Sequence, residues 1–163
     1  MTSPSRERSP NLPKYLSYTE AWRRIKSAHC TGFYFEVVTI CESIISDRLL
    51  SFVSAKSSSN IDTRVSFADL TKRWRKLAAG PLPRHGDADL GTAIDLWREE
   101  RNTIVHGLVK SSPGTPTAPV EEFVQRAKKA ADDGVALAKA VQRWHRQQLK
   151  SHQASLPASS RPL

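Results

Sequence analysis

Residues 33–55 read FYFEVVTICESIISDRLLSFVSA, without a glycine or a proline. Apolar side chains recur there every three or four positions, which is the spacing of one face of an α-helix. These side chains are Val38, Cys41, Ile45, Leu49, Phe52 and Val53. A helix this long and this apolar is too hydrophobic for a surface position, so we expect it at the centre of a helical bundle.

Weaker helical patterns flank this segment, over residues 18–32, 66–80, 87–108 and 119–144. Ser66 can cap the third helix, and Asp87 or Asp89 can cap the fourth. Gly134 weakens the last helix and allows a kink there. We find no β-hairpin signal and no internal repeat. The sequence therefore predicts an all-α fold, a single-domain bundle of about five helices.

The two ends of the chain differ in composition from its middle. Residues 1–14 and 151–163 are rich in serine, proline and polar groups, which do not bury enough surface to become ordered. A chain of 163 residues is too short for two ordinary domains. We expect one helical domain over residues 15–150 with a flexible tail at each end.

The charge balance indicates an anionic partner. There are 25 Lys and Arg residues against 16 Asp and Glu, a net charge of +9, and the pI is near 9.9. Nucleic acid is the commonest partner of such a basic protein, although a basic surface also favours solubility.

Cysteine usage and hydropathy bear on the cellular compartment. Cys30 and Cys41 lie on predicted helices and lack the spacing of a disulfide framework or a metal site. We therefore expect no metal and no cofactor. No apolar run is long enough to span a membrane, and residues 1–8 lack the apolar centre of a signal peptide. These features predict a cytoplasmic protein without a membrane partner.

The fourth helix carries the residues that point to a function, in the segment WREERNTIVHG of residues 97–107. At about 100° per residue, Arg101 falls on the apolar face, where its permanent charge needs an acid, an anionic ligand or a second subunit. Asn102 and His106 are four residues apart and therefore adjacent on the helix surface. His106 lies about 140° around the helix from Arg101. The side chains of Arg101 and His106 would therefore lie on either side of a phosphate bound at the edge of the apolar face. Gly107 could allow a substrate or another backbone to approach closely, or it could simply weaken the end of the helix.

Glu42 interrupts the apolar stripe of residues 33–55, so its carboxylate needs a partner there. Arg101 is the simplest partner to propose. Asp47, one turn further on beside Arg48, could extend a polar network, although a solvent-facing position is the more natural interpretation. A pair of Glu42 and Arg101 could be purely structural. The neighbouring Asn102 and His106 favour a functional interpretation.

The string Arg101-Asn102-Thr-Ile-Val-His106 resembles the motif of the HEPN superfamily (higher eukaryotes and prokaryotes nucleotide-binding), an arginine and a polar residue followed by a short spacer and a histidine. The five-helix pattern over residues 18–149 is similar too. The resemblance implies a small helical domain that dimerises, bringing two copies of the motif into one cleft, and that in many members cuts RNA without a metal ion. Arg101, Asn102 and His106 would then be catalytic, with Glu42 and Asp47 as supporting acids.

The residue types suit that reaction independently of the family. RNA cleavage without a metal uses the adjacent 2′-hydroxyl as nucleophile, so the protein must move protons and stabilise charge at phosphorus. A histidine such as His106 titrates near neutrality and can act as general base or acid. Arg101 offers a planar fork for phosphate oxygens. The expected products are a 2′,3′-cyclic phosphate and a 5′-hydroxyl, and DNA should resist because it lacks the 2′-hydroxyl.

One departure from the family concerns regulation. Members controlled by AMP transfer from a partner enzyme carry a tyrosine two residues after the histidine, where this chain has Leu108. We therefore expect any inhibitor or antitoxin protein to act by binding. A toxin and an effector of anti-phage defence remain equal alternatives.

Other residues receive a plainer interpretation. Lys72, Arg73, Arg75 and Lys76 surround Trp74 on the third helix, where they could track an RNA backbone or form a solvated outer face. The tryptophans occupy apolar helical positions and are expected in the core or an interface. The remaining histidines are expected to be ordinary surface or loop residues. They are His29, His85, His145 and His152.

Three functions are compatible with these observations. The leading hypothesis is a homodimeric, metal-independent endoribonuclease that acts on RNA as a toxin or defence effector. A non-catalytic HEPN-fold module that binds RNA or nucleotides is the second, and a protein-interaction module within a toxin–antitoxin or defence complex is the third. A purely structural ion pair does not explain an exposed His106 beside Asn102, which favours the first two.

Overall fold

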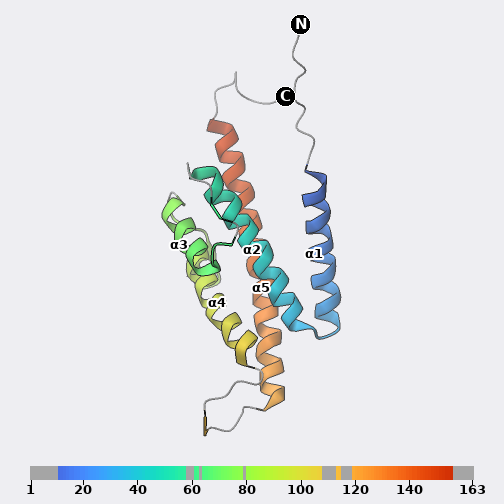
Figure 1. Ribbon diagram of the computed structural model, residues 1–163. Helices are drawn as coiled ribbons and strands as arrows, with labels where there is room; N and C mark the ends of the chain where they lie inside the picture. The colour runs from blue at the N-terminus through green and yellow to red at the C-terminus, as the bar shows by residue number, and fades with distance from the viewer. Residues whose placement is uncertain are drawn as a thin grey trace.

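The computed structural model describes residues 11–57, 61–62, 64–78, 80–107, 113–114 and 119–155. Within these ranges the chain is an all-α bundle, as the sequence predicted (Figure 1). Its five helices are α1 (Leu12–Cys30), α2 (Tyr34–Lys56), α3 (Phe67–Leu77), α4 (Leu90–Gly107) and α5 (Val120–Ser155). None of the described helices combines the length and the apolar composition that crossing a lipid bilayer requires.

Helix α2 is the centre of the bundle, in agreement with the prediction for residues 33–55. It packs most extensively on α5, and it also contacts α1 and α3. In Figure 1, α1 lies on one side of α2 while α3 and α4 lie on the other. Val37, Val38, Cys41, Ile45 and Leu49 of α2 are fully buried in the resulting core. Helices α1 and α4 are thereby separated by the α2–α5 pair, which places two different surfaces on opposite sides of the molecule.

Helix α5 runs from Val120 to Ser155 as one helix, and Gly134 serves packing rather than a break. The indole of Trp97 lies against Gly134, where an added Cβ would meet the ring carbon Cζ2 at 2.8 Å. The indole Nε1 also donates a hydrogen bond of 2.8 Å to the carbonyl oxygen of Ala130. The absence of a side chain at Gly134 therefore leaves a gap in the surface of α5, the Gly134 slot, into which the Trp97 side chain of α4 packs.

The prediction that no β-hairpin exists is wrong for one short segment. Strands β1 (Arg84–His85) and β2 (Ala88–Asp89) pair antiparallel around a turn in which Gly86 has a φ of 62°. A two-residue loop that begins with glycine suits such a turn, but strands this short carry no alternating pattern to detect. Asp89 then accepts hydrogen bonds from the backbone N–H groups of Gly91 and Thr92, which confirms it as the cap of α4.

The helical region is longer at both ends than residues 15–150. Helix α1 begins at Leu12 because the side chain of Asn11 accepts a hydrogen bond from the Lys14 backbone and Pro13 suits the first helical turn. Helix α5 reaches Ser155. The outer parts of the two expected tails, residues 1–10 and 156–163, lie outside the described residues.

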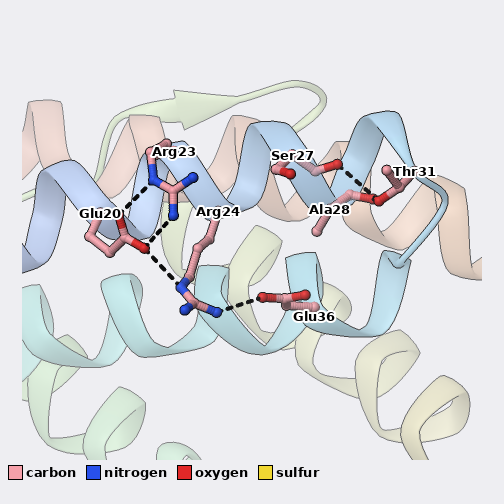
Figure 2. A network of polar contacts seen from close by, with 7 residues as sticks. All are labelled: Glu20, Arg23, Arg24, Ser27, Ala28, Thr31 and Glu36. Carbon is pink, nitrogen blue, oxygen red and sulfur yellow. Dashed lines mark hydrogen bonds and ion pairs between the residues drawn. The ribbon is translucent and has the colours of Figure 1, made fainter.

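The corner between α1 and α2 is held by polar contacts that Figure 2 shows. Arg24 of α1 lies between Glu20 of its own helix, at 3.0 Å, and Glu36 of α2, at 3.4 Å. A hydrogen bond from Arg23 is the main reason that the pKa of Glu20 falls to about 2. These pairs are exposed to solvent, so they orient the corner more than they stabilise it.

Candidate functional site

The predicted contact between α2 and α4 exists. The guanidinium Nη2 of Arg101 forms an ion pair with the carboxylate Oε2 of Glu42. Its Nη1 donates a hydrogen bond of 2.7 Å to the side-chain oxygen of Asn102. The side chains of Arg101 and Glu42 are 25% and 18% exposed, so the pair lies just below the surface. The guanidinium is therefore fixed from two sides while part of it still faces solvent.

The guanidinium of Arg101 is not fully satisfied by these two contacts. Its Nε is buried and has no hydrogen-bond partner among the residues that the structure describes. Arginine has five N–H donors and cannot lose its charge, and the contacts to Glu42 and Asn102 do not use every N–H of the two terminal nitrogens, so the exposed part of the guanidinium retains capacity for a further acceptor. An anionic group that reached the exposed part of this side chain would meet a preformed charge.

Asn102 and His106 extend the site along the outer surface of α4. Because the Asn102 side-chain oxygen accepts from Arg101, its amide group points two N–H donors elsewhere. His106 lies one turn further on, at the C-terminal end of α4, and is exposed. The imidazole makes no hydrogen bond within the described ranges. The order along the surface is thus a carboxylate, a guanidinium, an amide and a freely accessible imidazole.

Gly107 has room for a side chain in the isolated subunit. A Cβ at this position would lie 3.7 Å from the ring of Phe123, which is an ordinary van der Waals contact. Phe123 in turn stacks on Phe35 of α2, with ring centroids 5.6 Å apart. Nothing within the described fold therefore requires a glycine next to His106.

Asp47 is not brought to Arg101. It is five residues beyond Glu42, and this spacing turns it about 140° around α2, toward α1. There it accepts a 2.6 Å hydrogen bond from the Tyr18 hydroxyl and pairs with Lys14 at 2.8 Å. Burial would raise the pKa of Asp47, but the hydrogen bonds from Lys14 and Tyr18 outweigh it and lower that pKa. Asp47 thus belongs to a second polar cluster on the opposite side of α2.

The basic cluster of α3 is only partly available for a ligand. Arg75 reaches across Gly91, pairs with Asp95 at 3.1 Å and donates to Thr92 at 3.4 Å. An added Cβ at Gly91 would lie 2.5 Å from Nε of Arg75, so a larger residue there would displace the end of this flexible side chain. The other three cations of the cluster are exposed and form no ion pair with any described residue. They are Lys72, Arg73 and Lys76.

His145 departs from its predicted surface position, because it is only 4% exposed. It lies on α5, four residues after Val141 and seven after Ala138, so it continues their apolar stripe. That spacing is a signal that the sequence contains. Burial is the main reason that the pKa of His145 is lowered, and the nearby charge of Arg48 lowers it further.

The sulfur and metal chemistry of the described residues is limited. Cys30 is exposed, Cys41 is buried, and both are free thiols. Burial raises the pKa of Cys41 to about 12, which keeps its thiol protonated. Within the part of the chain that the structure describes, no three His, Cys, Asp or Glu side chains gather closely enough to hold a metal ion.

Comparisons of the chain with protein-family models, with curated proteins and with solved structures find no match.

Proposed function

We propose that this protein is a HEPN-type endoribonuclease that cleaves RNA without a metal ion, as a homodimer. The observation that supports the proposal best is the Arg101 guanidinium, held by Glu42 and Asn102 in a partly exposed position, one turn from the exposed His106. A fixed cation beside a titratable group is what cleavage of a phosphodiester requires. The net charge of +9 suits a polyanionic substrate.

Each residue has a distinct role in this proposal. Arg101 binds the non-bridging oxygens of the scissile phosphate and stabilises the negative charge that builds on them. Glu42 holds the guanidinium in place and is a positioning residue. Asn102 directs its free amide N–H groups toward the phosphate or the imidazole. His106 transfers protons, because an exposed imidazole can act as a general base or a general acid.

The reaction is an internal transfer at phosphorus. The ribose 2′-oxygen forms a bond to phosphorus while the bond from phosphorus to the 5′-oxygen breaks. The proton of the 2′-hydroxyl passes to a base, and the departing 5′-oxygen takes a proton from an acid. The products are a 2′,3′-cyclic phosphate and a 5′-hydroxyl. DNA cannot react in this way because it has no 2′-hydroxyl.

The need for both a base and an acid supports the dimer. One subunit supplies one imidazole at this surface, and a second copy across a two-fold axis would supply the other. Exposed apolar side chains beside the motif suit such an interface. They are Val105 on α4 and Val120 and Val124 on α5. Light scattering of the purified protein at working concentration should give about twice the 18.2 kDa mass of the chain.

A non-catalytic function is the second candidate, and one observation favours it. Both terminal nitrogens of the Arg101 guanidinium already have partners in the same chain, as in a purely structural ion pair. The protein would then bind RNA, a nucleotide or a partner protein without cleaving RNA. In either case a toxin or anti-phage role in the cytoplasm, controlled by an inhibitor that binds, remains part of the proposal.

Cleavage assays separate the two candidates. Purified protein is incubated with a defined single-stranded RNA in excess EDTA, and the ends of the products are identified. We expect cleavage by the wild type, loss of about 10²–10⁴-fold in rate for His106→Asn, and a similar loss for Arg101→Lys. Thr103→Ala changes an exposed residue of the same helix and should retain activity. Equal activity in all four proteins, or in none, overturns the catalytic proposal.

A further inference from the structure

A long groove runs between α1 and α5 on the side of the molecule away from α4. Its upper part is a cavity of about 510 Å³ between the first turns of α1 and the last turns of α5, with Arg48 of α2 behind them. Its lower part is a cavity of about 310 Å³ near the other end of α1. Trp22 lines both parts, so the two cavities follow one another along α1 and α5. Figure 1 shows α1 lying apart from α4, with α2 and α5 between them.

The walls of the groove are largely apolar, and the lysine and arginine side chains that line it have no aspartate or glutamate beside them in the described lining. Tyr15, Tyr18, Trp22 and Leu149 line the upper part, and Ile25 and Val135 line the lower part. The cations are Lys14, Arg48 and Arg146 above and Lys26 and Lys139 below. No aspartate or glutamate is among the described residues that line either part. Asp47 lies behind the groove, where its carboxylate already pairs with Lys14 and accepts a hydrogen bond from Tyr18.

Two features of the groove leave capacity for a further contact. Tyr15 of α1 and Leu149 of α5 both line the upper part and are 67% and 49% exposed, so apolar surface is left uncovered on both helices that border it. His145 lies in its wall, nine-tenths buried, and makes no hydrogen bond to any residue that the structure describes. A buried imidazole without a partner can accept or donate a hydrogen bond to an incoming group.

Two of the aromatic rings in the groove already have a cation near one face. The guanidinium of Arg48 covers the ring of Tyr18, 4.0 Å from its centroid. The ammonium of Lys139 lies 5.9 Å from the ring centroid of Trp22. Single-stranded nucleic acid binds basic grooves by stacking bases on free aromatic faces. Cations thus lie over the rings of Tyr18 and Trp22, and of the described tyrosine and tryptophan rings that line the groove only that of Tyr15 has no cation over it, which favours a protein partner over a stacked strand of RNA.

We propose that this groove is the docking site of an acidic amphipathic helix from a partner protein. Its apolar stripe would lie between α1 and α5, and its carboxylates would pair with the cations along the rims. Helix α1 spans 19 residues, so a partner helix of about 18 residues, or ~27 Å, would match the groove. This surface is separate from Arg101 and His106, and the inference does not depend on ribonuclease activity.

A binding experiment with a defined probe tests the proposal. The probe is a labelled peptide of about 18 residues with leucine at every third or fourth position and glutamate elsewhere. A peptide of the same composition with its leucines scattered serves as the comparison. Fluorescence anisotropy should show that the patterned peptide binds the full chain at least about tenfold more tightly. NMR should show that the indole N–H signal of Trp22 shifts on binding.

Matched charge reversals locate the site. Lys139→Glu with Arg146→Glu should weaken peptide binding by about tenfold or more, because both exposed cations line the groove. Lys72→Glu with Lys76→Glu makes the same change in net charge on α3 and should leave the affinity within about twofold. Equal losses in the two variants, no preference for the patterned peptide, or displacement of the peptide by single-stranded RNA would each overturn the proposal.

Discussion

The Arg101 guanidinium is shared between Glu42 and Asn102 inside one subunit, so a phosphate bound there must compete with a carboxylate. A substitution of Glu42 therefore tests how the ion pair contributes to stability and to phosphate binding. Glu42→Gln keeps the shape and one hydrogen bond but removes the neutralising charge. We expect the free energy of unfolding to fall by about 1–3 kcal/mol, less than for a fully buried pair because both side chains are partly exposed. Urea unfolding measures this change.

The same variant tests whether Arg101 meets RNA. With Glu42 neutralised, the guanidinium should bind phosphate more strongly, by about three- to tenfold for an RNA with 2′-O-methyl groups that cannot be cleaved. Cleavage of ordinary RNA should slow, because the positioning carboxylate is lost. An unchanged affinity would show that Arg101 does not contact the substrate. Asp47→Asn should leave the affinity unaltered, because Asp47 lies in the other polar cluster.

Gly107 distinguishes an isolated site from a composite one. In the subunit, Gly107→Ala meets only the Phe123 ring at 3.7 Å and improves helix propensity by up to about 1 kcal/mol. We therefore expect the melting temperature to stay the same or rise. If a second subunit or RNA approaches here, cleavage or dimerisation should nevertheless decrease. Undiminished activity and an unchanged dimer would rule out a close approach at this position.

At the level of helices, the contact between α4 and α5 depends on the Gly134 slot. Gly134→Ala would place a Cβ 2.8 Å from Cζ2 of Trp97, so we expect a loss of about 1–3 kcal/mol in the free energy of unfolding despite better helix propensity. Adding Trp97→Phe removes the second ring and should recover part of the loss caused by the alanine. Ala136→Gly, at an exposed position of the same helix, gives the pure propensity effect of about 0.5–1 kcal/mol. A stabilised Gly134→Ala protein would contradict the packing role.

The helices themselves could be predicted where a local signal dictates the outcome. The apolar stripe of α2 and the side-chain caps Ser66 and Asp89 act within a few residues, and the structure confirms all three. The hairpin of β1 and β2 could not be predicted, because its strands are two residues long and their pairing depends on the turn alone. The packing role of Gly134 could not be predicted from the sequence either. It depends on Trp97, a residue far away in the sequence.

Across the whole molecule, the buried His145 should make stability depend on pH. Its pKa is lowered, chiefly by burial and also by Arg48, so the unfolded chain takes up this proton before the folded chain does. Stability should therefore fall as the pH drops below about 6.5, the ordinary value for histidine. His145→Gln removes that proton-binding group. Melting temperatures measured between about pH 7.5 and pH 5 should fall less steeply in the variant. Parallel curves for the two proteins would contradict the assignment.

The candidate site was predictable to the extent that it obeys helical geometry. Glu42 and Arg101 each interrupt an apolar stripe, and in a bundle such stripes face each other, so their pairing follows from the sequence. Asp47 was assigned to the same site although its position on α2 turns it toward α1. The groove between α1 and α5 had no sequence signal, because it depends on how two helices at opposite ends of the chain lie relative to each other.

Helix α5 borders both the groove and the neighbourhood of the motif, and its 36 residues form one rod. From Phe123, beside Gly107, to Val135 in the lower part of the groove, the rise along the helix is about 18 Å. A partner anchored along the groove is thereby held at a set distance from the edge that carries His106. To obstruct that edge it would need a tether of at least about six extended residues. Helix α5 thus fixes the distance between the groove and His106. A partner without such a tether could occupy the groove without hindering access to His106.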